Sequence, residues 1–248
     1  MPNRADTSLG HGGAQFRSTI WNCLEMLQGP DRPEKQDAFD QIVRWYWKPV
    51  YRFIRVGWNR TNDDAKDLTQ GFFETMLHRD ALAKADPARG KFRTFLKTAV
   101  RNFLANEHRG AQAVKRGGGR SILPTDFQED PPDLVAPSAS PDDIFEREWA
   151  RTLVSTALER LRAAMQGEQE LHFRIFEACD LHDAAVPDPT HEELAQRFSL
   201  SAGEIKRILK STRVRLRDFV VEEIRKYAQS DEEVWEERDY LISLWDRK

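Results

Sequence analysis

The chain has little of what secreted and membrane proteins need. Only two of its 248 residues are cysteine, which excludes a disulfide framework and favours a reducing compartment. No apolar run approaches the roughly 20 residues of a membrane-spanning helix. Residues 1–13 contain no apolar segment of the kind found in secretory signals. We therefore expect a cytoplasmic protein that does not cross a membrane.

Strand signals are scarce as well. Runs of β-branched residues with period-two alternation do not recur, whereas apolar residues repeat at helical spacing along most of the chain. This pattern predicts an all-α fold, with helices near residues 16–27 and 35–56, another from Asn62, and more from residues 92 and 142. Pro87 and Gly90 mark a loop before the fourth helix. In that helix, Phe92, Phe95, Leu96, Val100 and Phe103 form the apolar stripe, and Arg93, Lys97 and Arg101 are assigned to its other faces.

The motifs of common enzyme families are missing too. The chain contains no Gly-rich phosphate loop, no H-E-x-x-H and no G-x-S-x-G. A zinc site built from His172, Cys179, His182 and His191 has no usual ligand spacing. We therefore expect no enzyme, no cofactor and no metal.

The net charge is only −3, but charges of each sign are segregated. Residues 91–120 carry eight Lys and Arg against one acid, residues 126–148 carry eight acids against one base, and residues 204–217 carry six bases against one acid. Two basic segments separated by an acidic one indicate two contacts with the same polyanion.

These patterns divide the chain into five parts. We predict a disordered N-terminus (1–14), a helical domain (15–116), a flexible linker rich in acid, proline and glycine (117–141), a second helical domain (142–227) and an acidic amphipathic helix at the end (228–248). The last segment is expected to fold back on a domain or to hold the basic surface when DNA is absent. Truncation at Ser230 should then raise DNA affinity.

The second domain carries the pattern of a helix-turn-helix. Thr190 and Glu193 form a capping-box pattern, a short helix follows, and Ser201 is placed to cap a second, strongly basic helix. That helix would enter the major groove of DNA, and its candidate contacts are Ser201, Glu204, Lys206, Arg207, Lys210 and Arg213. The alternative is an ordinary helical hairpin with a solvated charged face.

Two segments of the first domain are candidate contact surfaces. The basic segment 91–120 has the charges to hold a DNA backbone, although Phe95 and Phe103 at helical spacing are more typical of a core. Residues 63–77 combine acids with an apolar stripe, which suits either a protein partner or a solvated helix over a core.

Taken in order, three segments resemble the RNA polymerase sigma factors of the extracytoplasmic-function group. D-A-K-D-L-T-Q-G-F-F at 64–73 is similar to the helix of that family that binds the polymerase β′ subunit. R-G-K-F-R-T-F-L at 89–96, followed by V-R-N-F-L at 100–104, is similar to the region that melts and reads the −10 element. E-L-A at 193–195 with L-S-A-G-E-I-K at 200–206 is similar to the domain that reads the −35 element.

The resemblance implies a transcription initiation factor whose partners are core RNA polymerase (β′ and β subunits) and promoter DNA. A separate anti-sigma protein is a further candidate partner. The implied polymerase contacts are Asp64, Asp67, Leu68, Gln70 and Phe73. The implied −10 contacts are Lys91, Arg93, Lys97, Arg101, Asn102, Arg109, Lys115 and Arg116, and the loop at 86–91 together with Asn102 would hold a flipped base.

Two other functions remain open from the sequence. The chain could be a helix-turn-helix regulator that acts without polymerase, its N-terminal half serving as a sensor or dimerisation domain. It could also be an adaptor whose basic faces bind acidic proteins, in which case its DNA affinity would not fall steeply with salt.

Overall fold

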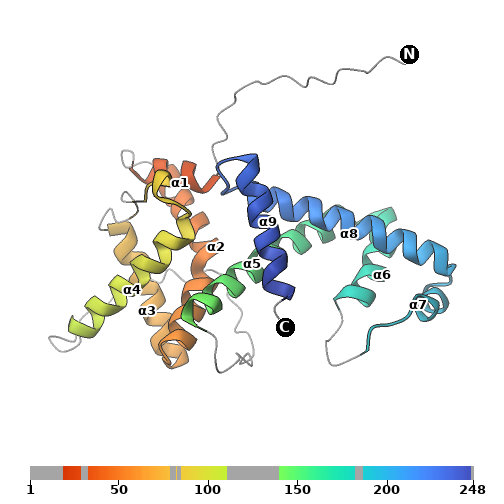
Figure 1. Cartoon of the computed structure of the whole chain (residues 1–248), viewed down its shortest axis with the longest axis horizontal. Helices are drawn as coiled ribbons and strands as arrows, with labels where there is room; N and C mark the ends of the chain where they lie inside the picture. The colour runs from red at the N-terminus through yellow and green to blue at the C-terminus, as the bar shows by residue number, and fades with distance from the viewer. Residues whose placement is uncertain are drawn as a thin grey trace, which may run out of the picture.

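The computed structural model describes residues 19–28, 33–78, 82, 85–110, 140–181 and 187–246, and these residues form helices without any strand (Figure 1). The prediction of an all-α fold is confirmed for this part of the chain. The α-helices are α1 (Thr19–Gln28), α2 (Pro33–Gly57), α3 (Asn62–His78), α4 (Phe92–Gly110), α5 (Pro141–Ala164), α6 (Glu170–Asp180), α7 (His191–Phe198), α8 (Ala202–Arg225) and α9 (Asp231–Asp246). Short 3-10 turns precede α4 and α6, at Pro87–Arg89 (η2) and Gly167–Gln169 (η3).

The helices bury two groups of apolar side chains. The larger group lies between α1, α2, α3, α4 and α5 and also takes in the end of α8 and part of α9. Its centre is aromatic: Trp47 stacks on Phe73 with ring centroids 5.7 Å apart, and Phe53 meets Phe145 edge-on at 6.0 Å. Burying a side chain of this size contributes about 1.5–3 kcal/mol. Pairs such as Phe53–Phe145 therefore hold α5 firmly against α2.

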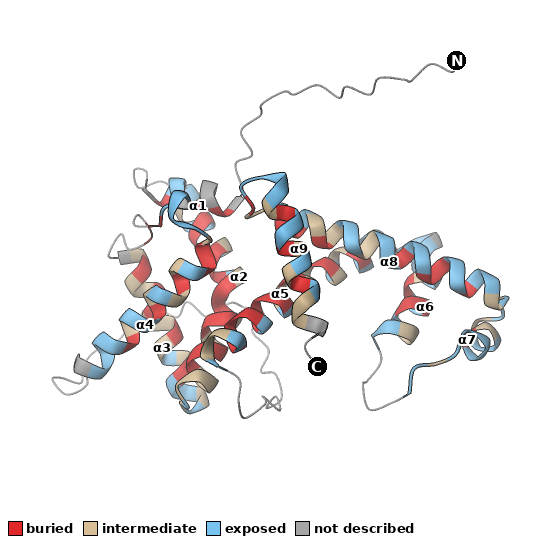
Figure 2. Cartoon of the chain, in the orientation of Figure 1, coloured by how far each residue is buried: buried red, intermediate tan, exposed pale blue. Residues whose placement is uncertain are grey.

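The smaller group joins the far end of α5 to α6, α7 and α8. Leu161, Ile175, Phe176, Leu194 and Ile205 are all buried in it. Figure 2 shows buried residues along α5 on both sides of the point where α9 crosses it. The 24-residue helix α5 thus contributes to both groups.

α5 begins at the predicted end of the linker. Ser140 caps it through a capping box with Asp143, and Pro141 occupies its first turn. These two residues, assigned above to the linker, therefore belong to the start of the helix. Residues 1–14 and 117–139, expected to be disordered and flexible, lie outside the described residues.

Local signals located most helix ends. The capping box Thr190–Glu193, the N-cap at Ser201 and the loop before α4, where Gly90 adopts a positive φ of 116°, are confirmed. Ser201 also forms a capping box with Glu204, which was not predicted from the sequence. Asn62, which precedes two acids, is predicted to cap α3, but the capping side chain is that of the preceding residue, Thr61. The hydroxyl of Thr61 accepts the Asp64 N–H at 3.2 Å, while the Asn62 side chain accepts a hydrogen bond from the Tyr51 hydroxyl at 2.6 Å.

None of the described helices is long and apolar enough to cross a membrane.

Two glycines inside helices provide matched tests of this packing. A Cβ at Gly57, at the end of α2, would lie 2.8 Å from Pro141 Cβ, whereas a Cβ at Gly71 would lie at an ordinary 3.5 Å from Phe103. We expect Gly57→Ala to destabilise the fold by about 1–3 kcal/mol through overpacking. Gly71→Ala should stabilise it by about 0.5–1 kcal/mol by removing glycine's entropy cost. Urea unfolding of both variants checks the signs, and equal effects would contradict the close approach of α2 and α5.

Candidate nucleic-acid interface

The first turns of α8 present three cations to solvent. α7 ends at Ser199, which adopts a left-handed conformation with φ 55°, and the Leu200 N–H closes the turn on the Ala195 carbonyl at 3.0 Å. Lys206, Arg207 and Lys210 follow on the exposed side of α8, while Ile205 and Leu209 face the smaller core. Among the described residues, no carboxylate lies within ion-pair distance of these three cations. They form the face that we call the α8 cation face.

The other predicted contacts of α8 are engaged within the chain. The Glu204 carboxylate accepts the Ser201 N–H at 2.9 Å and its hydroxyl at 2.7 Å. These hydrogen bonds lower the pKa of Glu204. Arg213 donates two hydrogen bonds to Asp180 of α6, at 2.7 and 2.6 Å. Ser201 and Glu204 therefore set the start of α8, and Arg213 ties α8 to α6.

The cations of α4 whose side chains the structure describes are also paired, and their partners come from distant helices. Lys97 donates to Glu146 of α5 at 2.6 Å and lies 3.8 Å from Asp142. Arg101 pairs with Asp142. Lys97 is largely covered, but 44% of the Arg101 side chain remains exposed. The charges of Lys97 and Arg101 are thus neutralised by the first turns of α5.

Arg93 is buried in spite of its charge, with 6% of the residue exposed. Its two Nη groups donate to the two carboxylate oxygens of Glu237 in α9, and its Nε lies 2.9 Å from Glu146. The guanidinium is centred 4.4 Å from the Trp149 ring and 5.3 Å from the Tyr240 ring. The assignment of Arg93 to a face outside the apolar stripe is wrong, because α5 and α9 cover it.

Lys91 shares the same partner. Its ammonium donates to Glu237, whose side chain is fully buried, and the Tyr227 hydroxyl donates to that carboxylate at 3.3 Å. We call Lys91, Arg93, Glu146 and Glu237 the buried charge cluster. It joins α4, α5 and α9, which are far apart in the sequence. The expectation that the terminal helix folds back on a domain is confirmed.

Charge pairing sets the direction of the pKa shifts in this cluster. Burial alone would raise the pKa of Glu237, but Arg93 and Lys91 together hold it below its usual value. Burial alone would lower the pKa of Arg93, but Glu237 and Glu146 keep it above its ordinary value. Burial raises the pKa of Tyr46 and Tyr227, so these phenols near the cluster stay neutral. At neutral pH Glu237 is therefore an anion and Arg93 a cation.

The lowered pKa of Glu237 predicts a pH dependence of stability. A carboxyl whose pKa is lower in the folded state stabilises the fold above its unfolded pKa, about 4.3 for Glu, and loses this contribution as the pH falls through the folded value. We expect Glu237→Gln to lower the free energy of unfolding most at pH 7, and we expect its difference from wild type to shrink below about pH 4. Urea unfolding at pH 7 and at a pH below 4 measures this difference. The exposed neighbour variant Glu236→Gln should show no such trend, and a constant Glu237 difference would contradict the assignment.

The predicted polymerase contacts on α3 separate into two sets. Asp64 and Asp67 are exposed, and Leu68 and Gln70 are half-buried, with the Gln70 amide donating to Glu74 at 3.1 Å. Phe73 is only 1% exposed and packs among Trp47, Phe39 and Phe72. Phe73 is therefore a core residue that is not accessible to a partner. The accessible face of α3 is acidic.

A groove of about 450 Å³ runs between α3 and α4. Phe95, Asn102 and Phe103 line it, together with Thr98 and Asn106. Asn102 is exposed, and both phenylalanines are half-buried. The groove thus combines aromatic faces with amide and hydroxyl groups, which is a suitable surface for an unpaired base.

The remaining predicted residues are only partly described. The side chain of Arg109 and all of Lys115, Arg116 and His182 lie outside the described part of the chain. Cys179 is close to Arg213 and Asp180, and burial raises the pKa of its thiol. Within the described ranges, no three metal-ligating side chains come together.

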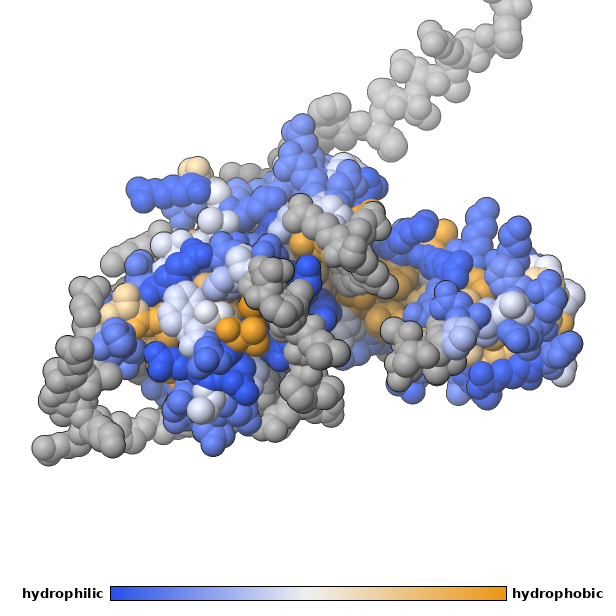
Figure 3. Space-filling view, turned by 60° about the horizontal axis from the view of Figure 1, so that its bottom comes forward, coloured by the Kyte–Doolittle hydropathy of each residue, from blue (hydrophilic) through white to orange (hydrophobic). Residues whose placement is uncertain are grey.

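Sequence reasoning missed an apolar groove of about 500 Å³ where α5, α6, α8 and α9 meet. Leu158, Leu216 and Leu241 line it, and Arg217 lies at its edge. Figure 3 shows apolar surface gathered between the larger part of the molecule and the lobe that carries α6 to α8. Concave apolar surfaces of this size are typical of binding sites.

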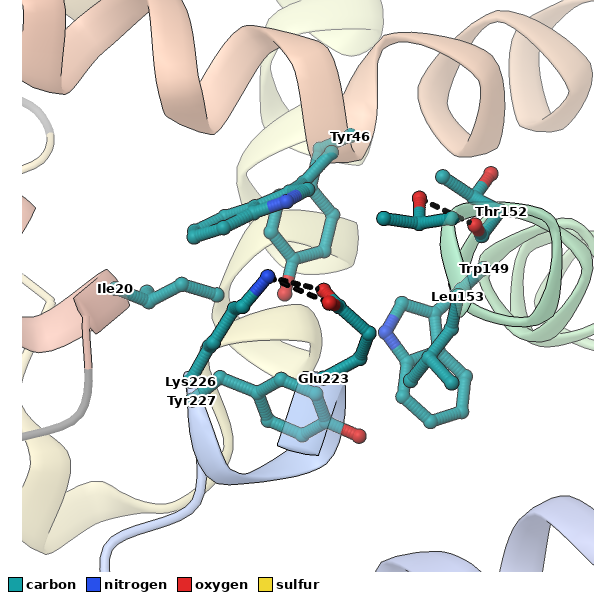
Figure 4. A pocket seen from close by; sticks show the side chains of 10 residues that line it. Ile20, Tyr46, Trp149, Thr152, Leu153, Glu223, Lys226 and Tyr227 are labelled. Carbon is teal, nitrogen blue, oxygen red and sulfur yellow. Dashed lines mark hydrogen bonds and ion pairs between the residues drawn. The ribbon is translucent and has the colours of Figure 1, made fainter. Parts of the chain in front are cut away.

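A much smaller cavity, about 30 Å³, lies beside the end of α8 (Figure 4). Lys226 pairs with Glu223 at 2.6 Å across it, and the Lys226 carbonyl accepts the Ile20 N–H at 3.0 Å. The space suits one or two water molecules. These contacts fix the turn between α8 and α9, and with it the approach of α9 to α4.

Comparison with known proteins found no relative of this chain. No family model, no curated protein and no solved structure matches it.

Proposed function

We propose that the chain is a transcription initiation factor of the sigma type, which binds core RNA polymerase, recognises two promoter elements and promotes opening of the duplex. The observation that carries the proposal is the α8 cation face. α7 and α8 each begin with a capping box and are joined by the short turn at Ser199–Ser201, and the start of α8 carries three exposed cations. This is the arrangement that a helix-turn-helix uses to reach bases and phosphates in the major groove.

Three further features support a second DNA contact and a polymerase contact. The α3–α4 groove offers stacking faces and the Asn102 amide to an unpaired base. Of the described cations on or next to α4, Lys91 and Arg101 are 35% and 44% exposed, whereas Arg93 and Lys97 are covered. Asp64 and Asp67 give α3 an exposed acidic edge for a basic surface of the polymerase.

Binding to core polymerase tests this function directly. We expect the chain to co-elute with purified core enzyme in gel filtration. The double variant Asp64→Arg/Asp67→Arg should lose this association, because its charges would repel the same surface. Asp37→Arg, at an exposed acid of α2, is the control and should still bind. No co-elution of the wild type would refute the sigma-type function.

A regulator that acts without polymerase is the second candidate. The observation that favours it is that the α8 cation face is open, while Arg93, Lys97 and Arg101 of α4 are paired internally. Such a protein would bind duplex DNA through α8 and would not co-elute with core polymerase, so the same experiment separates the two functions.

A further inference from the structure

The carboxylate of Glu237 lies where the phosphate of a nucleic acid would bind. Both of its oxygens accept hydrogen bonds from the two Nη groups of Arg93, and the Lys91 ammonium donates to the same carboxylate. An arginine fork with a nearby lysine is the donor set that binds phosphate bidentately. Within the cluster, Glu237 therefore fills an anion site.

The rest of this site comes from α5. Glu146 lies 2.9 Å from the Nε of Arg93 as an ion-pair partner, and Trp149 lies against the guanidinium. Both residues come from α5, which is fixed by Phe145, Ala150 and Leu153 in the larger core. If α9 moved away, both Nη groups and the lysine would lose their partner, while Glu146 and Trp149 would remain beside Arg93.

α9 is held much less firmly than α5. Among its described side chains, Val234, Glu237 and Leu241 are buried, whereas Trp235 and Ile242 are about half exposed. One of its three buried residues is thus the carboxylate itself. Exchange of that carboxylate for another anion would remove much of what holds the helix in place.

We propose that Lys91 and Arg93 form a phosphate site for the DNA backbone, and that α9 closes this site by placing Glu237 in it. The inference rests on the proposed function, since the ligand is the backbone phosphate of the opened strand. In the closed state the Lys91–Arg93 site is unavailable, whereas the α8 cation face is open. Binding of a DNA strand at α4 and docking of α9 then exclude each other.

Removal of the Glu237 charge tests this. The probe is a fluorescein-labelled single-stranded DNA of mixed sequence, and the readout is fluorescence anisotropy with the full chain at low salt. Glu237→Gln should bind the probe at least tenfold more tightly than wild type. Glu236→Gln removes the same charge from an exposed position of the same helix and should change affinity less than twofold. Adding Arg93→Gln to Glu237→Gln should abolish the gain.

Hydrogen exchange of α9 in the wild-type chain gives a second readout that needs no variant. Saturating single-stranded DNA should speed exchange of the amides of residues 234–244 while leaving α5 protected. An unchanged α9 in the presence of bound DNA would overturn the inference, even if Glu237→Gln failed to fold. So would a folded Glu237→Gln protein that binds DNA no better than Glu236→Gln. If none of the proteins binds any DNA, it is the proposed function that fails.

Discussion

Replacing Arg93 by methionine should lower the free energy of unfolding by about 3–5 kcal/mol, because removal of one partner leaves a buried charge unpaired. Glu237 has no exposed surface and would keep only Lys91 and Tyr227 as donors. Glu146 would retain Lys97 but lose its 2.9 Å contact with the Arg93 Nε. Urea unfolding at pH 7 measures the change.

Arg101→Met is the matched control for this substitution. It removes the same kind of side chain from the same helix, and its partner is also a carboxylate of another helix. Both groups are largely exposed, however, so its cost should stay below about 1 kcal/mol. The double variant Arg93→Met/Glu237→Met should recover part of the loss, since the fully buried carboxylate is then removed together with its arginine. Lys91, which loses Glu237, is 35% exposed and can be solvated by water. Equal costs at Arg93 and Arg101 would contradict the burial of the cluster.

The second large effect is expected at the α8 cation face. Changing Lys206, Arg207 and Lys210 together to glutamine should weaken binding to duplex DNA on the order of a hundredfold near 0.1 M salt. Each phosphate contact contributes about 0.9 to the slope of log K against log salt, so the slope should also become shallower by about 2–3. Anisotropy titrations at several salt concentrations provide both numbers.

Three exposed cations elsewhere form the control for that experiment. Arg44 in α2, Arg147 in α5 and Arg225 at the end of α8 are exposed. The buried neighbours of each on its helix pack in the larger core, whereas the start of α8 packs in the smaller one. Their change to glutamine alters net charge by the same amount but removes no proposed contact. A triple control that weakens binding as much as the α8 variant would show that only the overall charge matters.

The helical fold follows from the sequence because its signals are local. Apolar spacing of three and four residues indicated the helices, and Thr190 and Ser201 marked the starts of α7 and α8 through hydrogen bonds within one turn. The Asn62 error is also local, since the neighbouring Thr61 offers an equally suitable hydroxyl. Such signals need no knowledge of the rest of the chain.

The buried charge cluster could not be derived this way, because its members are brought together by tertiary packing. Arg93 and Glu237 are 144 residues apart. A partial signal was present, however. Glu237 falls on the stripe of Val234 and Leu241, and Arg93 falls on the stripe of Leu96 and Val100, so each charge occupies a position where the helical period places a buried side chain. Charges within apolar stripes on two helices predict a buried ion pair, but not which two helices share it.

Run-off transcription tests the central claim most directly. Purified core RNA polymerase is supplied with fragments of the genome that encodes the chain, with and without the protein, and the 5′ ends of the RNA are sequenced. The account predicts RNAs that start at defined positions only when the chain is present, and their loss with the triple glutamine variant of the α8 cation face. RNA starts that are the same with and without the chain would contradict it.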